Sequence, residues 1–530
     1  MAHVKKQPDL FSGTLSANGA TLGFESTLWA IADRLRGQME VSQYKHLILG
    51  LLFLRLLSEN AGSHSARKRT QTSSRHVSRP AQHRSVPADV FEVPDAASWG
   101  TLVANATPKN IPRLLDRAMQ ALEECNDTLR GALFKEYVRS GLNAERLFDV
   151  FRELAQLDIA EHKTNSLDVL GRVYEYFLGQ FARAEGAKGG EYYTPKCVVQ
   201  LLVEMLAPYK GSVYDPCCGS GGMFVQSERF VAEHGGRRGD INLFGQESNP
   251  ATWRLAKMNL AIHGLHANVG SSSADTFQNP LHEALEADYI IANPPFNMKD
   301  WGGELLRHDP RWKYGMQPTG NANYAWIQHF VHHLATTGVA GFVLANGSLA
   351  SNTSGEGDIR ARLIEDDVVE CIVALPGHLF YSTQIPASLW FFTKSKSAGC
   401  GVNGHSLRDR SGEVLFIDAR DFGLMIDRVH RSLTSAEIER IADVYHRWRG
   451  DRVGSYQDIP GFCRAVTLKD IRDHKFALVP GRYVGFDRSQ QNIVSFSDLK
   501  DEMQAIETTL HSVTASAGHA ITLIRDLLNG

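Results

Sequence analysis

The stretch "SVYDPCCGSGGMF", residues 212–224, joins a short apolar run to a glycine-rich turn. The turn that follows Asp215 consists of small residues, among them Gly219, Ser220, Gly221 and Gly222. In a doubly wound α/β sheet the first strand-to-helix turn holds a nucleotide-like ligand, because glycines let backbone amides approach it. The stretch therefore predicts a sheet of this class with a ligand site, against the alternative of a plain tight turn.

The residues around the turn also indicate which ligand it holds. A dinucleotide-binding fingerprint needs glycine where Phe224 stands, and a P-loop needs Gly-Lys-Ser or Gly-Lys-Thr; the sequence has neither. Asp215, the acid before the glycines, instead favours a ligand that carries a positively charged amine.

Outward from this stretch, short apolar runs alternate with amphipathic helical patterns. We expect strands at residues 212–216, 241–247, 288–293, 341–346, 369–376 and 387–394. Such alternation is typical of a parallel sheet with helices on its faces.

The flanking segments have other patterns. Residues 22–165 show mostly helical periodicity, and residues 61–88 carry six Lys or Arg and no acid, which indicates either a solvated insertion or a phosphate-binding arm. Apolar residues between 498 and 528 recur in steps of three and four, as in a coiled-coil seam. We therefore predict a helical domain (1–165) with a basic loop, an α/β domain (166–480) and a helical tail (481–530) that needs a helical partner, either the body of this chain or another subunit to which the tail docks.

Composition limits the class of protein. The 530 residues have a net charge of -3, so no global basic field attracts nucleic acid. Seven cysteines, an odd count, fit reduced thiols, and the start "MAHVKKQPDL" lacks the apolar core of a secretion signal. The most apolar segment, residues 46–57, is shorter than the roughly 20 residues of a membrane span. We expect a cytoplasmic protein in which this segment is a buried helix.

A second site is predicted in "ADYIIANPPFNMKDW", residues 287–301. An apolar strand ends there at Asn293, Pro294, Pro295 and Phe296. Prolines fix φ and remove backbone N–H groups, so the turn is stiff and rich in carbonyl acceptors. It could present acceptors and one flat ring to a ligand with an N–H₂ group; the alternative is a strand-ending turn with a ring in the core.

Three further segments could bind the remaining parts of the ligand. Glu247, at the end of the second strand, suits two ribose hydroxyls, and Asp275 suits an adenine amino group, although the one could be merely solvated and the other turn-forming. A helix follows the segment Glu191, Tyr192, Tyr193, Thr194 and Pro195. Its N-terminus could receive a carboxylate. An amine, a ribose, an adenine and a carboxylate together describe S-adenosyl-L-methionine.

The chain resembles the modification (M) subunits of type I restriction-modification systems, which are N6-adenine DNA methyltransferases. The resemblance covers nearly the whole chain and rests on "DVLGRVYEYFLGQFA", "GGEYYTPK", "DPCCGSGG", "IANPPFN", "GNANYAWIQHF" and "LPGHLFYSTQIPASLWF". It implies a Rossmann-like methyltransferase sheet of seven strands, the last antiparallel. It also implies DNA, a specificity (S) subunit, a second M subunit held through it, and possibly a restriction (R) subunit as partners. The basic loop at 61–88 departs from the more acidic stretch expected there.

The chemistry expected of this family assigns roles to the proline turn. If the Asn293 side-chain oxygen and the Pro294 carbonyl accept both N6 hydrogens of adenine, the nitrogen lone pair can turn toward the sulfonium methyl. The adenine must leave the duplex, and Phe296 would stack on it; no metal is required. The alternatives are a related enzyme acting on protein glutamine or ribosomal RNA, and a catalytically silent scaffold.

Overall fold

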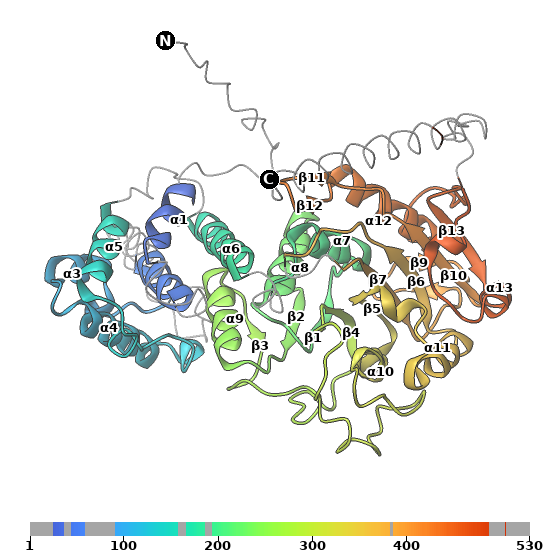
Figure 1. The fold of residues 1–530 in the computed structure, drawn as a ribbon, viewed down its shortest axis with the longest axis horizontal. Coiled ribbons are helices and arrows are strands. Elements are labelled where there is room, and N and C mark those ends of the chain that lie inside the picture. Colours follow the sequence, from blue (N-terminus) through green and yellow to red (C-terminus); the bar gives the residue numbers. More distant parts are fainter. Residues whose placement is uncertain are drawn as a thin grey trace, which may run out of the picture.

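A computed structural model describes residues 25–35, 44–58, 91–156, 166–185, 193–381, 385–486 and Gln504. The N-terminal helices lie at one end of the molecule and a sheet covered by helices at the other (Figure 1). The predicted basic loop at 61–88, the seam at 498–528 apart from Gln504, and the site residues Glu191 and Tyr192 lie outside the described residues.

Nine strands of the described chain form one sheet, in the order β13-β10-β6-β7-β5-β4-β1-β2-β3. Their bounds are β1 Gly211–Asp215, β2 Ile241–Gly245, β3 Ala267–Asn268, β4 Ala287–Ala292, β5 Leu334–Ala345, β6 Val369–Ala374, β7 Ala387–Thr393, β10 Glu413–Asp418 and β13 Cys463–Thr467. Strands β1 to β5 run parallel, and β7 inserts antiparallel between β5 and β6. The predicted seven-stranded sheet with an antiparallel last strand is confirmed. Strands β10 and β13, which the sequence analysis missed, extend it beyond β6.

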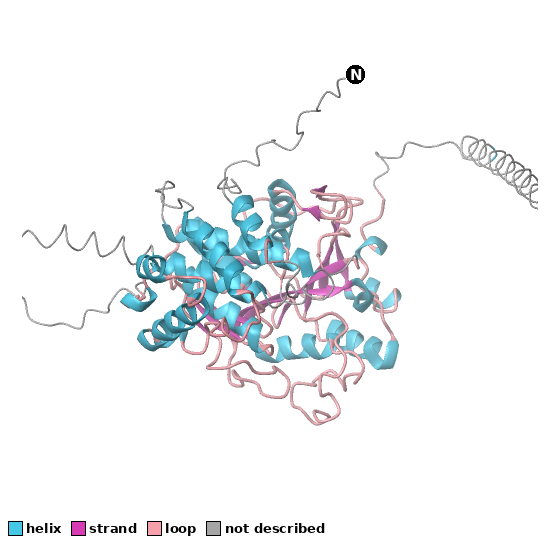
Figure 2. Ribbon diagram, turned by 60° about the vertical axis from the view of Figure 1, so that its left-hand side comes forward, coloured by secondary structure: helices cyan, strands magenta, loops and turns pink. Residues whose placement is uncertain are grey.

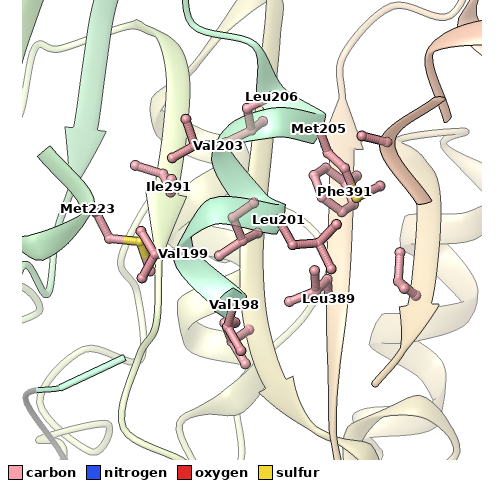
Figure 3. Packing of buried hydrophobic residues seen from close by; sticks show 14 of the residues in the cluster. Val198, Val199, Leu201, Val203, Met205, Leu206, Met223, Ile291, Leu389 and Phe391 are labelled. Atoms are coloured by element: carbon pink, nitrogen blue, oxygen red, sulfur yellow. The ribbon is translucent and has the colours of Figure 1, made fainter. Parts of the chain in front are cut away.

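Helices cover both faces of the sheet (Figure 2). Their bounds are α7 Lys196–Leu206, α8 Gly222–Glu233, α9 Pro250–Ile262, α10 Asn323–His333, α11 Glu356–Glu365, α12 Ser435–Arg449 and α13 Leu468–Asp473. Strand β4 shows how the faces are filled: Tyr289 and Ile291 pack with α7, α8 and α12, whereas Ile290 and Ala292 pack with α10 and α11. This period of two follows from the pleat of a strand. Figure 3 shows α7 lying against the sheet, with its Leu201 close to Leu389 of β7.

The N-terminal helices enclose a core of their own. They are α1 Glu25–Asp33, a helix over 44–58, α3 Trp99–Asn105, α4 Ile111–Cys125, α5 Ala144–Gln156 and α6 Ser166–Glu185. The apolar segment at 46–57 is buried in this core, as predicted. Helix α9 joins the two parts, because Leu255 and Met258 pack into the helical core while Ala256 and Leu260 pack under the sheet. Among the described helices, none is long and apolar enough to cross a membrane.

Candidate active site

The glycine turn lies at the carboxyl end of β1, between β4 and β2. Gly219 and Gly221 have φ values of 54° and 78°, in the left-handed region that favours glycine. A Cβ on Gly222 would meet no heavy atom of the described residues within 4 Å. The backbone amide of Cys218 is bonded to the carbonyl of Gln246, beyond β2, at 2.9 Å. The turn is thus fixed to the neighbouring strand and leaves open space beside Gly222.

Two carboxylates stand at this turn. Asp215 is 1% exposed, and its Oδ1 accepts from the amide of Cys217 at 3.1 Å. Glu247 accepts from Gly219 N at 3.1 Å through Oε2 and from Asn249 N at 2.7 Å through Oε1. Glu247 therefore holds the glycine turn in place, a role that the sequence analysis did not assign to it.

The electrostatics of this pair favour a cation. Burial raises the pKa of Asp215 to about 8, an effect that the Cys217 amide opposes and the nearby Glu247 carboxylate reinforces. Burial also raises the pKa of Glu247, against the hydrogen bonds from Asn249 and Gly219. Within the described residues neither carboxylate forms an ion pair with Lys or Arg. A positively charged ligand group would supply the missing counter-charge.

Asp275 lies on a loop that is bonded to the same site. The amide of Ala274 donates to the backbone carbonyl of Glu247 at 2.9 Å. The Oδ1 atom of Asp275 accepts from the amides of Phe277 at 2.9 Å and Gln278 at 2.8 Å, which is the turn-forming arrangement weighed as an alternative. This oxygen shapes the loop, which the Ala274 amide bonds to the backbone of Glu247.

Arg311 fixes the same loop and was not found from the sequence. Its guanidinium donates to the carbonyls of Thr276 at 3.1 Å and Phe277 at 2.8 Å, and it is paired with Asp309 at 2.7 Å. The only sequence signal is an isolated "DPRW", which does not reveal a partner more than thirty residues away.

The proline turn lies at the same end of the sheet as the glycine turn and contains an unsatisfied hydrogen-bond acceptor. Asn293 follows β4, the neighbour of β1. Its Nδ2 donates to Thr194 Oγ1 at 3.0 Å, whereas its Oδ1 is buried without a hydrogen-bond partner among the described residues. A buried acceptor without a partner costs about 1–3 kcal/mol, so this oxygen is suited to a donor on a substrate. Thr194, predicted in the cofactor segment, here fixes the Asn293 amide.

Aromatic rings line the side of this turn. The half-buried Phe296 ring contacts Phe380 edge to face, with centroids 5.7 Å apart. Tyr193 stacks on Tyr381 at 5.9 Å. Phe380 and Tyr381 were not predicted as site residues, although an aromatic pair in the loop between two strands, within "LPGHLFYSTQIP", was a usable signal.

Comparisons with known proteins agree with this architecture. Residues 165–492 match the model of the N-6 DNA methylase family, and residues 24–154 match that of the HsdM N-terminal domain. The chain is 44% identical over 407 residues to the type I restriction enzyme HindI methylase subunit of Haemophilus influenzae, which covers 75% of this chain and 88% of that protein.

Two more relatives extend the match. The type I restriction enzyme MjaIX methylase subunit of Methanocaldococcus jannaschii is 34% identical over 506 residues, covering 91% of this chain and 88% of that protein. A crystal structure of the type I restriction-modification system methyltransferase subunit from Streptococcus thermophilus superposes with a TM-score of 0.69 at 25% identity. It covers 88% of this chain and 99% of that one.

Proposed function

We propose that this chain, which belongs to the family of type I restriction-modification methylase subunits, binds S-adenosylmethionine at the glycine turn and a target adenine at the proline turn. The chain is an N6-adenine DNA methyltransferase, the modification subunit of a type I restriction-modification system. The observation that carries the proposed site is the buried, unpaired Oδ1 of Asn293 next to the carboxylate-lined glycine turn.

The residues at the glycine turn fit S-adenosylmethionine. Within the described residues, Asp215 and Glu247 are paired with no Lys or Arg, and the open space beside Gly222 leaves room for a ligand. Asp215 would bind the amine, Glu247 the ribose hydroxyls and the Asp275 loop the adenine, while the segment from Tyr193 to Pro195 would receive the carboxylate. Ser220 belongs to the same turn. The bound cofactor supplies a methyl group on a sulfonium centre.

The proline turn would orient the target. The N6 nitrogen of adenine is a weak nucleophile because its lone pair is delocalised into the ring. Asn293 Oδ1 and the Pro294 carbonyl would accept its two hydrogens, and Pro295 keeps the turn stiff. Thr194 holds the amide so that its oxygen faces the substrate. Phe296, supported edge-on by Phe380, offers a ring for the extruded base.

Biochemical assay of the assembled enzyme tests this assignment. The chain, purified with the subunits it assembles with, is incubated with S-adenosylmethionine and unmethylated DNA from its own source, and N6-methyladenine is measured by mass spectrometry. We expect N6-methyladenine with the wild type and none above background with Asn293→Ala. Methylation by the variant at the wild-type rate would contradict the assignment of Asn293.

The proposed partners are the specificity subunit, a second M subunit held through it, and the restriction subunit. The apolar seam at 498–528 supports a helical partner, because a single helix cannot bury such a stripe alone. We expect a chain truncated before Asp498 to bind S-adenosylmethionine and to lose co-purification with the specificity subunit. Complex formation by the truncated chain in size-exclusion chromatography would place the docking surface elsewhere. We also propose the domain division at about residues 165 and 480, because the pattern of apolar residues changes near these positions.

A further inference from the structure

A small hairpin between β10 and α12 exposes apolar side chains. It consists of β11 Leu424–Met425 and β12 Arg431–Ser432 with the turn between them. Its exposed apolar residues are Leu424 (64%), Met425 (49%), Ile426 (44%) and Val429 (45%). Single exposed apolar residues are common, but four within six positions, with polar residues around them, are typical of a binding surface.

The hairpin has a defined conformation of its own. Ile426 N donates to His430 O at 2.9 Å, and Asp427 Oδ1 accepts from the amides of Val429 at 2.8 Å and His430 at 2.7 Å. Asp427 Oδ2 is also paired with His430 Nδ1 at 2.7 Å. The tip is therefore preorganised, and the Asp427 carboxylate is already occupied by donors of the turn itself.

The hairpin is attached to the loop that lines the proline turn. Arg431 N donates to His378 O at 2.8 Å, and the His430 ring stands edge-on to Tyr381, with centroids 4.9 Å apart. The adjoining residue, Phe380, contacts Phe296. One short loop thus contacts both the hairpin and the ring proposed to stack on the target adenine.

One guanidinium group lies in the hairpin tip, and a second contacts Tyr381, the ring beside His430. Arg183, from α6, lies over Tyr381 with its Cζ 4.7 Å from the ring centroid, and its Nη2 donates to the Tyr381 hydroxyl at 2.9 Å. Arg428 is exposed at the tip. Within the part of the chain that the structure describes, neither arginine is paired with a carboxylate. These uncompensated charges complement phosphates, although the whole chain is slightly acidic.

We propose that the β11–β12 hairpin binds duplex DNA beside the extruded adenine. Arg183 and Arg428 bind phosphates, and the tip residues Ile426 and Val429 pack against the base stack that the adenine leaves. Apolar side chains next to arginines are used in this way by proteins that open base steps, and a base-flipping enzyme needs contacts that replace the lost stacking. This inference rests on the proposed function, because it takes the target to be an adenine in DNA.

Photo-crosslinking identifies the occupant directly. Val429 is replaced by p-benzoylphenylalanine in the full chain, which is assembled with its partner subunits. The probe is an end-labelled duplex that carries the site mapped by sequencing N6-methyladenine in the source genome. Val453, 95% exposed beyond the end of α12, is the matched control position. We expect crosslinks to DNA from position 429 and not from 453. Crosslinks from 429 to a protein chain, or to nothing, would overturn the proposal.

The charge contribution is measured with Arg428→Ala, and Arg428→Lys serves as the control that keeps the charge. A lost phosphate contact weakens binding about equally for all DNA sequences, most strongly at low salt, and reduces the slope of log K against log salt by about 1. Cofactor affinity and co-purification with the other subunits should not change. An unchanged salt slope would remove Arg428 from the interface.

The two proposals fail in different ways. Asn293→Ala should retain the crosslink from position 429 and lose methylation. An active enzyme without that crosslink leaves the proposed chemistry standing and refutes the hairpin contact. A wild-type enzyme that crosslinks DNA from position 429 but produces no N6-methyladenine refutes the proposed chemistry.

Discussion

The glycine turn and the proline turn follow the neighbouring strands β1 and β4. Their polar groups differ in how completely they are hydrogen-bonded within the chain. At the glycine turn both carboxylate oxygens of Glu247 accept backbone amides, and Asp215 accepts from Cys217. At the proline turn one half of the Asn293 amide is bonded and the other, Oδ1, has no partner. The carboxylates of the glycine turn therefore have hydrogen-bond partners within the chain, whereas the free oxygen of Asn293 gains its partner only from a substrate.

This difference separates binding from chemistry. Interactions made equally in the ground state and the transition state change affinity, and interactions made at the reacting group change the rate. Residues at the glycine turn should therefore affect cofactor binding, and residues at the proline turn should affect the methyl-transfer step. The predictions below test this division, beginning with the largest effect.

Asn293→Ala should break the proline turn's function alone. Removal of one oriented acceptor lowers the rate by about 10² to 10³, because one N6 hydrogen then lacks its partner. Single-turnover methylation measures the loss, and calorimetric titration of S-adenosylmethionine should give a dissociation constant close to that of the wild type. A weakened cofactor with an unchanged rate would reverse the roles of the two turns.

Glu247→Ala should break the glycine turn's function. The substitution removes the acceptor for the ribose hydroxyls and for the amide of Gly219. Unpaired polar groups cost about 1–3 kcal/mol, which corresponds to a rise of roughly 5- to 160-fold in the cofactor dissociation constant. Calorimetric titration measures it. Glu439→Ala, at an exposed position on α12, is the control. If titration of Glu247→Ala matches the control, Glu247 has no part in cofactor binding.

The two turns also differ in how far the sequence predicts them. Local signals sufficed for the strand ends, because glycines and prolines act on their immediate neighbours: β1 ends at Asp215 and β4 at Ala292, next to the predicted breakers. The partner of Asn293 was not predictable in this way, since Thr194 lies 99 residues away and only the sheet brings the two together.

The missed elements have a similar explanation. Strand β10 is apolar over Val414 to Ile417 and resembles other short runs that could be helix or strand. Its place beside β6 depends on long-range pairing. The role of Asp275 was ambiguous for a different reason, because an aspartate before a turn can bind its own backbone or a ligand with equal ease.

The raised pKa of Asp215 predicts that cofactor affinity at the glycine turn depends on pH. With a pKa of about 8 in the free protein, its carboxyl is mostly protonated below that pH, and a ligand amine favours the ionised form. Cofactor binding must then expel a proton, so affinity should rise with pH by up to about tenfold per unit toward pH 8. It should be highest near pH 8 and fall above it, because the ligand's amine, with a pKa of about 8, then loses its own charge. Asp215→Asn should flatten the profile. A flat wild-type profile would contradict contact between Asp215 and the amine.

The smallest effect is expected at Thr194, the residue of the predicted cofactor segment that is bonded to Asn293 of the proline turn. Thr194→Val keeps the shape of the side chain and removes the oxygen that accepts from Asn293 Nδ2 at 3.0 Å. The amide can then rotate and present its N–H₂ to the adenine, which also carries donors. Loss of one ordinary hydrogen bond, about 0.5–1.5 kcal/mol, corresponds to a fall in the methyl-transfer rate of roughly 2- to 12-fold. Thr194→Ser retains the hydroxyl and should stay near the wild-type rate.

If the valine and serine variants lose rate equally, the hydrogen bond is not what orients Asn293. If the valine variant instead weakens cofactor binding at an unchanged rate, Thr194 belongs to the glycine turn's half of the site.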